Sequence, residues 1–275
     1  MSQKIIDIHT PGKSLFAEYF EFLSAQQKWD WVVQNEDHFN QESIRTADAV
    51  LVDTTLSPAI LPKLTTMPAQ IRNIGCMDSL FKDDGSWYPR LLLFESLRQV
   101  IVDKAHDVDT NSPAFVVGDN EAACTAVAVL THMGYSDVYM TSENEEVLKK
   151  VMSFLRQGHI GVKIHGIAAS ELTMHSVSCS IAVNCLPIEE NKVLLADLSY
   201  FNFMKRTGIV VELNLLPVEN VLLEESEKAG LRNIHPIEIA VKTTELWLER
   251  LGKKMKVEDI HQSWESFLKT KAVTK

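Results

Sequence analysis

Residues 113–133 read PAFVVGDNEAACTAVAVLTHM, and this stretch decides the fold. Its first part, Pro113–Gly118, is a short apolar run that ends in glycine, as a buried strand does before a tight turn. Its second part, Glu121–Met133, carries small residues at helical spacing. A strand, a glycine turn and a helix in this order predict a dinucleotide-type site, in which the free N–H groups of the helix N-terminus hold a pyrophosphate.

Strands continue to alternate with helices after this stretch. A second helix is predicted over Glu143–Leu155. The further strands are predicted at 136–140, 161–165, 180–184 and 208–212. Such alternation implies right-handed crossovers and a parallel sheet with helices on both faces. Residues 112–235 are therefore predicted to form a Rossmann-like domain.

The preceding part of the chain has a pattern of its own. Strands are predicted over Lys4–Ile8 and Ala49–Asp53, and a helix over Leu91–Val102. Ser14 precedes the periodic run LFAEYFEFLSAQQ and is a natural helix N-cap, because its hydroxyl can accept from an unpaired backbone N–H. The polar segment DKAHDVDTNSP then reads as a linker. Residues 1–103 are therefore predicted to form a separate α/β domain.

Composition excludes several classes of protein. The 275 residues carry a net charge of −10, and this acidic balance argues against a nucleic-acid binder. No apolar signal segment opens the sequence, and no run approaches the roughly 20 apolar residues that span a bilayer. The four cysteines form no CxxC pair and are too scattered for a disulfide scaffold. We therefore expect a soluble, cytoplasmic protein without a membrane or nucleic-acid partner.

The glycine turn departs from the dinucleotide fingerprint. The pattern G-x-G-x-x-G/A falls on Gly118, Asn120 and Ala123, so an asparagine stands where glycine would let the backbone approach the phosphates. Asp119 and Glu121 flank it with carboxylates. One like-charge contact at about 4 Å costs on the order of 4 kcal/mol at an effective dielectric of about 20. Cofactor binding is therefore expected to be absent or weak.

The end of the second strand of this domain bears on the choice of cofactor. Residues 141–146 read TSENEE, which places Glu143 where the adenosine ribose would lie. A carboxylate there accepts from a 2′-OH and repels a 2′-phosphate, so NAD is favoured over NADP if either binds. The alternative is structural, with Ser142 capping the next helix and the glutamates complementing its positive end.

Several short segments resemble the shikimate dehydrogenase family. Residues 211–223, VELNLLPVENVLL, followed by Ala229 and Gly230, resemble its segment V-x-D-x-x-Y-x-P-x-x-T-x-L-L-x-x-A-x-x-x-G. VNCLP, which contains Asn184, resembles the family's I-N-A-T-P. GKSLF, which contains Ser14, resembles its S-x-S-P loop, and Asp78-Ser79-Leu80 resembles N-T-L. The cofactor-side positions that the resemblance and the glycine turn together indicate are Gly118, Asn120, Ala123, Glu143 and Asn184.

The resemblance implies an α/β architecture of two domains. A small N-terminal α/β domain (1–103) would be followed by the Rossmann-like domain (112–235), and C-terminal helices would pack back on the first domain. Two amphipathic helices predicted within 236–271 agree with that arrangement.

Two catalytic positions of the family are not matched. Its members use a lysine in N-V-T-x-P-x-K and an aspartate in N-T-D-G, between which the reacting hydroxyl is bound and deprotonated. Here residues 52–58, VDTTLSP, which include Thr55, occupy the first region, and no lysine follows until Lys63. SWYPR occupies the second region, with Arg90 or Pro89 where the aspartate should be.

The substrate positions are also altered. Asp84 is an alternative for the missing aspartate, but together with Gly85 it fits better as a hairpin turn. The family's tyrosine becomes Leu215, its glutamine falls at Lys242, and of its two serines only the second remains. The implied substrate cleft is therefore lined by Ser14, Thr55, Arg90, Leu215 and Lys242.

Other kinds of site find less support in the sequence. His159, His165 and His175 invite a metal, but no HExxH or matched acidic set accompanies them, so no metal site is predicted. Cys124, near a helix start, could have a lowered pKa, although a small buried residue is the simpler interpretation. No G-x-S-x-G elbow indicates a serine hydrolase.

Two functions follow from these observations. The first is a shikimate-dehydrogenase-like protein that has lost ordinary dehydrogenase catalysis and binds a small anion in the interdomain cleft, or a protein partner or second copy. Arg90, beside Trp87 and Tyr88, would suit a carboxylate, and the alternative is that these aromatic side chains plug the cleft. The second is an NAD(P)-dependent oxidoreductase with relocated catalytic groups, acting on shikimate or another small hydroxy acid. The unmatched catalytic positions favour the first.

Overall fold

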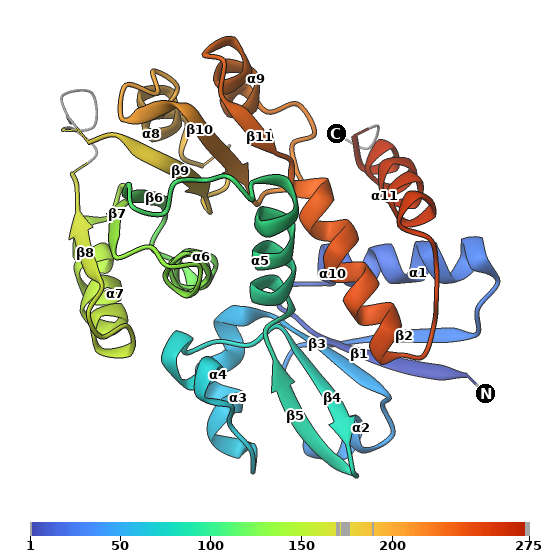
Figure 1. Cartoon of the computed structure of the whole chain (residues 1–275). Coiled ribbons are helices and arrows are strands. Elements are labelled where there is room, and N and C mark those ends of the chain that lie inside the picture. The colour runs from blue at the N-terminus through green and yellow to red at the C-terminus, as the bar shows by residue number, and fades with distance from the viewer. Residues whose placement is uncertain (1, 169–170, 172–176, 189, 273–275) are drawn as a thin grey trace. The chain divides into compact units, whose positions relative to one another are not determined.

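The computed structural model describes residues 2–168, 171, 177–188 and 190–272, in two compact units (Figure 1). Unit 1 is Met1–Leu93 with Thr243–Lys275, and unit 2 is Phe94–Lys242. Both divisions fall inside helices, α5 (Leu92–Lys104) and α10 (Pro236–Arg250). The predicted domains were 1–103 and 112–235, with the linker between them. In the structure the chain passes between the units within each of these two helices, and the polar segment after residue 103 lies within unit 2.

Unit 1 contains a mixed sheet with the strand order β2-β1-β3-β4-β5. The strand β1 lies between β2 and β3 and pairs in parallel with both, and β3, β4 and β5 pair antiparallel. The strands are β1 (Gln3–Ile8), β2 (Trp31–Glu36), β3 (Ala49–Val52), β4 (Ser79–Asp83) and β5 (Ser86–Arg90). The predicted strands are confirmed, and Asp84 and Gly85, both at positive φ, form the hairpin turn expected of them.

Helices from both ends of the chain complete unit 1. They are α1 (Leu15–Gln27), α2 (Gln41–Arg45), α3 (Ser57–Ile60), α4 (Ala69–Ile74), the end of α10, and α11 (Val257–Ala272). Trp264 of α11 stacks on Tyr19 of α1, with ring centroids 3.7 Å apart. Trp247 of α10 packs against Phe20 and Phe81. The C-terminal helices therefore pack on the N-terminal sheet, as the resemblance implies.

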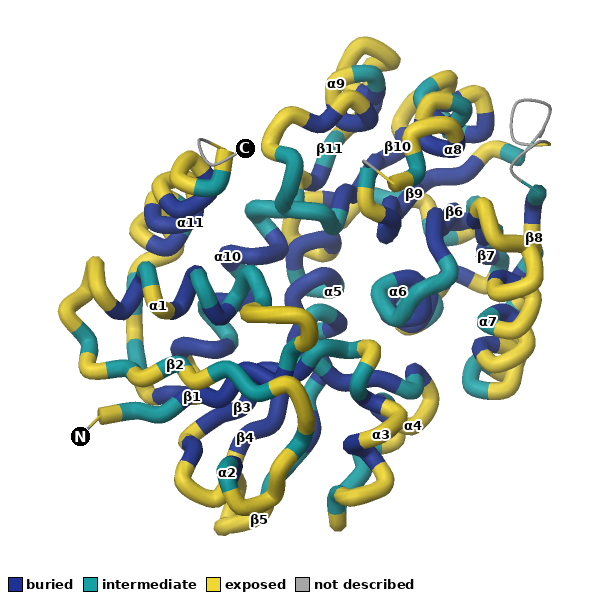
Figure 2. The backbone as a smooth tube through the Cα atoms, turned by 180° about the vertical axis from the view of Figure 1, so that it is seen from behind, coloured by how far each residue is buried: buried dark blue, intermediate teal, exposed yellow. Residues whose placement is uncertain are grey.

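Unit 2 contains a fully parallel sheet with the strand order β11-β10-β9-β6-β7-β8. The strands are β6 (Ala114–Val117), β7 (Asp137–Thr141), β8 (Lys163–Gly166), β9 (Cys179–Asn184), β10 (Met204–Glu212) and β11 (Arg232–Ile234). The Rossmann-like arrangement is confirmed. The central strands β6 and β9 are buried along their whole length and dark blue in Figure 2, as expected of a sheet covered on both faces.

Helices cover both faces of this sheet. Figure 1 shows α6 (Glu121–His132) and α7 (Glu145–Gly158) on one face, and α8 (Lys192–Leu198) and α9 (Val221–Lys228) on the other. Leu194, Leu195 and Leu198 of α8 share an apolar core with Phe115 and Val210 of the strands. The helices that follow β6 and β7 therefore lie on one face, and those that follow β9 and β10 lie on the other.

Local capping explains where several helices begin. Ser14 is the N-cap of α1, and its hydroxyl accepts from the Ala17 N–H at 3.1 Å, as predicted. The predicted cap of α7 is wrong, because the helix begins at Glu145 and its N-cap is Asn144. The amide oxygen of Asn144 accepts from the Val147 N–H, whereas the Ser142 hydroxyl donates to Asp119.

Candidate functional site

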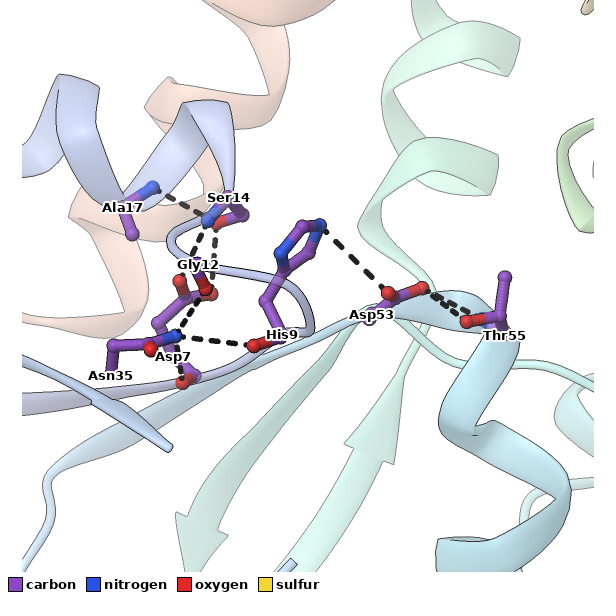
Figure 3. Close-up of polar contacts among 8 residues, drawn as sticks. All are labelled: Asp7, His9, Gly12, Ser14, Ala17, Asn35, Asp53 and Thr55. Carbon is purple, nitrogen blue, oxygen red and sulfur yellow. Dashed lines mark hydrogen bonds and ion pairs between the residues drawn. The ribbon is translucent and has the colours of Figure 1, made fainter. Parts of the chain in front are cut away.

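The carboxyl ends of β1 and β3 bring polar side chains together in unit 1 (Figure 3). Ile8 and Val52 are paired in register at these ends, so His9 and Asp53 leave the sheet as neighbours. His9 Nε2 lies 3.8 Å from Asp53 Oδ2, with side-chain exposures of 29% and 15%. Ligands commonly bind outside the carboxyl ends of parallel strands, so this edge is the natural candidate site in unit 1.

Asp53 is held by the short helical turn that follows it. Its Oδ1 accepts from the Thr55 N–H at 3.0 Å and from the Thr55 hydroxyl at 2.7 Å. The predicted cleft residue Thr55 is therefore at this site, but its hydroxyl proton is used locally. The second oxygen, Oδ2, faces His9.

Ser14, the other predicted cleft residue at this edge, is also engaged. Asp7 is fully buried in β1, and its Oδ1 accepts from the Ser14 hydroxyl at 2.8 Å. Its Oδ2 accepts from the Ser14 N–H, also at 2.8 Å. Because the Ser14 hydroxyl donates to Asp7 and accepts from Ala17, it has no proton left for a ligand carboxylate.

The loop between β1 and α1 is fixed from β2. The Asn35 amide donates to the carbonyl oxygens of Asp7, His9 and Gly12, with the shortest contact, 2.6 Å, to Gly12. Lys13, on the same loop, directs its ammonium group to Glu21 of α1. The loop cation is therefore already paired.

A third carboxylate lies beside this edge. Asp78 precedes β4, and its backbone carbonyl accepts from the Val52 N–H at the end of β3. Its side chain accepts from the Leu92 and Leu93 N–H groups at 2.8 and 2.7 Å, which caps the start of α5. Asp7, Asp53 and Asp78 together give the strand ends of unit 1 an acidic character, which disfavours an anion there.

Arg90 lines a different hollow of unit 1. A cavity of about 460 Å³ holds Arg90 and Tyr88 of β5 with Lys82 and Asp83 of β4. Its remaining lining residues are Asp48, Phe81, Glu249 and Arg250. Asp48 precedes β3, so this cavity extends to the amino end of that strand, whereas Asp53 follows the carboxyl end.

The glycine turn of unit 2 leads from β6 into α6. Gly118 has φ +137°, and an added Cβ would lie 3.2 Å from Cys185 Cβ and 3.3 Å from Ala123 Cβ. Both the glycine and the small residue at position 123 are therefore required by close packing, as in a dinucleotide turn.

The Asn120 side chain fills the N-terminus of α6. Its oxygen accepts from the Ala123 N–H at 2.9 Å, and its nitrogen donates to the Cys185 carbonyl at 3.0 Å. A phosphate approaching this helix end would have to displace the asparagine. The backbone group that a pyrophosphate would use is thus already paired within the protein.

Carboxylates surround the same turn. Asp119 precedes Asn120 and accepts from the Ser142 hydroxyl at 2.7 Å, and Glu121 lies in the first turn of α6. Glu143, the predicted ribose contact, is exposed between β7 and α7.

Asn184, at the end of β9, belongs to a buried polar network. Its amide donates to Glu212 at 2.8 Å and to the Leu186 carbonyl, and its oxygen accepts from the Leu186 N–H. Glu212 is fully buried and also accepts from Asn214. The predicted cofactor residue Asn184 thus uses its polar atoms inside the fold.

Burial raises the pKa of Glu212 above its ordinary value, against the opposing effect of hydrogen bonds from Asn184 and Asn214. The folded state then holds a proton at pH values where the unfolded chain has lost it. The free energy of unfolding should fall as pH rises from the ordinary carboxyl range through the folded pKa. We expect Glu212→Gln to remove this pH dependence of the free energy of unfolding, measured by urea unfolding at a series of pH values. Glu219→Gln, at an exposed carboxyl, should leave the pH dependence unchanged. Parallel pH profiles for the wild type and Glu212→Gln would contradict the assignment.

The two remaining predicted cleft residues lie in unit 2. Leu215 follows β10 and is half-buried. Lys242 is a half-buried residue of α10 and the last residue of unit 2. Ser14, Thr55 and Arg90 belong to unit 1. Within unit 1, the structure brings Ser14 and Thr55 to one edge of the sheet.

The cysteine and the histidines singled out from the sequence form no reactive or metal-binding group among the described residues. Burial, with a smaller effect of the Glu121 charge, raises the pKa of Cys124 to about 12, which opposes activation of this thiol by the helix. Among the residues that the structure describes, no group of three or more His, Cys, Asp or Glu side chains could hold a metal ion. His159 contacts Thr131, His165 pairs with Asp137, and His175 lies outside the described residues.

Comparisons with known proteins identify the fold. The sequence matches no protein-family model and no curated protein. Solved structures match over nearly the whole chain. Shikimate 5-dehydrogenase from Listeria monocytogenes, in complex with shikimate and NAD, is 15% identical with a TM-score of 0.77 and covers 95% of each chain. The chain has the shikimate dehydrogenase fold.

Other enzymes share this fold with the chain. Quinate dehydrogenase from Corynebacterium glutamicum, in complex with NAD, is 13% identical with a TM-score of 0.76, covering 97% of this chain and 99% of that one. The 5-ketofructose reductase of a Gluconobacter species is 12% identical with a TM-score of 0.77 and the same coverage. At these identities the similarity establishes the fold, as the sequence resemblance implied, and the site must be judged on its own residues.

The sequence did not predict that the following polar residues lie at the carboxyl ends of the strands of unit 1. These residues are Asp7, His9, Asn35, Asp53 and, as a helix cap, Asp78. One signal was available, since His9 directly follows one predicted apolar strand and Asp53 is the last residue of another. The side chains of such residues converge at one edge when the strands are parallel neighbours.

In the part of the chain that the structure describes, no helix combines the length and apolar character needed to cross a bilayer.

Proposed function

We propose that this protein binds a small molecule on a shikimate dehydrogenase fold and no longer performs hydride transfer with a nicotinamide dinucleotide. The observation that carries the proposal is the occupied N-terminus of α6. The Asn120 side chain accepts from the Ala123 N–H and donates to the Cys185 carbonyl. Asp119 and Glu121 add negative charge beside it.

The catalytic positions support the same function. The turn after β3, Thr54–Leu56, carries no lysine, and Lys63 directs its ammonium group over the Phe39 ring. Arg90 lines its own cavity. A general base must reach the proton that it removes. Lys63 and Arg90 do not form the lysine–aspartate pair that the family resemblance implies.

The expected anionic ligand finds no support at the carboxyl ends of β1 and β3. Ser14 is committed to Asp7, and Lys13 is paired with Glu21. A protein partner or a second copy stays a prediction from the sequence. The proposal is therefore confined to a small ligand.

The competing function is an NAD-dependent oxidoreductase of altered chemistry. It is favoured by the extent of the structural match, because the shikimate 5-dehydrogenase and quinate dehydrogenase neighbours were both solved with NAD. Glu143 would favour NAD over NADP in that case. Dinucleotide binding separates the two functions directly.

We expect NAD, NADH, NADP and shikimate each to leave the thermal unfolding of the wild-type protein unchanged at millimolar concentration. A ligand present at 100 times its dissociation constant adds about 2.7 kcal/mol to the free energy of unfolding. A saturable upward shift with any dinucleotide would favour the oxidoreductase instead.

Asn120→Gly combined with Glu121→Gly should create weak dinucleotide binding, because it frees the helix N–H groups and removes one negative charge. Isothermal titration with NAD measures the gain. The matched control is Asn144→Gly with Glu145→Gly at α7, where the asparagine caps its helix in the same way. That control should bind no NAD, and both changes should cost only a few tenths of a kcal/mol for the cap itself. No gain in the first variant would show that this cap is not the obstacle.

A further inference from the structure

The gap between His9 and Asp53 has the dimensions of a site for a hydroxyl group. At 3.8 Å, His9 Nε2 and Asp53 Oδ2 are too far apart for a good direct hydrogen bond. An oxygen atom placed beside the line joining them can lie about 2.8 Å from both, which is an ordinary hydrogen-bond length. Both side chains keep part of their surface exposed, so such an atom can enter.

The environment of His9 favours a proton on Nε2. Its other nitrogen, Nδ1, is buried and has no hydrogen-bond partner among the residues that the structure describes. A buried N–H without an acceptor is less tolerable than a bare lone pair, so the tautomer with the proton on Nε2 is favoured. His9 then donates into the gap.

Asp53 supplies a hydrogen-bond acceptor on the other side of the gap. Its Oδ1 is fixed by two bonds from Thr55, which directs Oδ2 to the gap as an acceptor. A group that sits between His9 and Asp53 must therefore accept from one and donate to the other. A hydroxyl does both, whereas a carboxylate only accepts and would face the charge of Asp53.

The charges that the structure places beside this gap disfavour a negatively charged group. Asp7 is buried beneath the Ser14 loop, Asp78 caps α5, and Lys13 is paired with Glu21. A carboxylate in the gap could accept from His9, but it would face the charge of Asp53 and a serine with no proton to donate.

We infer that His9 and Asp53 together bind a hydroxyl of the ligand, and that the part of the ligand held at the ends of β1 and β3 is an uncharged, hydroxylated carbon skeleton. This inference rests on the proposed small-molecule function and names the ligand class for its site. At this edge it favours a neutral polyol over the small anion expected from the sequence.

A matched pair of probes tests the ligand class. Methyl shikimate and shikimate carry the same hydroxyl groups and differ in whether the carboxyl group is charged, and myo-inositol is a second neutral probe. Each is titrated into the full chain while the backbone amide resonances of His9, Asp53 and Thr55 are followed by NMR. We expect both neutral probes to shift these resonances, with methyl shikimate binding at least tenfold more tightly than shikimate.

Two variants assign the preference to this pair. Asp53→Asn keeps an oxygen for the Thr55 bonds and removes the charge, so the preference for the ester should fall to within about twofold. Asp83→Asn removes an exposed carboxylate at the hairpin end of β4 and should leave the preference for the ester unchanged. His9→Gln should weaken all three probes together, because the ring that donates into the gap is lost.

Either of two results would overturn the inference. One is that shikimate binds as tightly as its methyl ester at these amides. The other is that none of the three probes shifts them, which would leave water as the occupant of the gap. The proposed function fails separately, if NAD added to the same samples shifts the amides of Gly118–Ala123.

Discussion

Trp264→Ala should lower the free energy of unfolding by about 3–5 kcal/mol, the range for removing a large aromatic side chain from a core. Trp264 is fully buried and stacks on Tyr19 at an interplanar angle of 13°. Its indole N–H donates to the Thr244 hydroxyl at 2.9 Å. The substitution therefore leaves a cavity between α1 and α11 and removes a buried hydrogen bond. Urea unfolding followed by circular dichroism measures the loss.

Two further changes isolate the cause. Trp264→Phe keeps an aromatic ring against Tyr19 and should lose clearly less stability than alanine. Tyr200→Ala removes an aromatic side chain that is 72% exposed, and it should change the free energy of unfolding by less than about 0.5 kcal/mol. A loss below about 1 kcal/mol for Trp264→Ala would mean that α11 contributes little to the stability of unit 1.

Asp78→Ala should be the second severe substitution, with a loss of about 2–4 kcal/mol. The Asp78 carboxylate accepts from the Leu92 and Leu93 N–H groups and from the Ser79 hydroxyl. Replacing a capping side chain by alanine costs about 0.5–2 kcal/mol, and leaving a buried polar partner unpaired, here the Ser79 hydroxyl, costs about 1–3 kcal/mol. The negative charge of Asp78 at the helix N-terminus also interacts favourably with the helix dipole. Thermal and urea unfolding of the variant measure the effect.

The amide variant separates geometry from charge. Asp78→Asn keeps one acceptor oxygen, so it should lie between the wild type and alanine. Asp83→Ala, at the exposed end of the same strand, is the control and should be close to neutral. If Asp78→Ala were no more harmful than Asp83→Ala, the capping role of Asp78 would have to be abandoned.

Much of the fold could be predicted because its signals are local. The apolar run before Gly118 and the small-residue periodicity of α6 are legible within some twenty residues, and Ser14 caps α1 as expected. The strand β2 and the helix α8 were missed. The exposed and half-buried residues of β2 give no clear apolar alternation, and the helical run of α8 is only seven residues long.

The candidate site could be predicted only in part. Ser14 and Thr55 were found through the family resemblance, but their engagement with Asp7 and Asp53 was not. Asn120 was expected to crowd the phosphate turn. Its real effect is a pair of bonds, one of which reaches the Cys185 carbonyl 65 positions away in the sequence. No spacing rule connects two such residues.

The sequence by itself determined the alternation of strands and helices, the glycine turn and the loss of the expected lysine, because each depends on residue identity within a short window. Only the tertiary structure decided that His9 stands beside Asp53 and that Asp78 caps α5. Those pairs depend on strand register, which brings together side chains that are far apart along the chain.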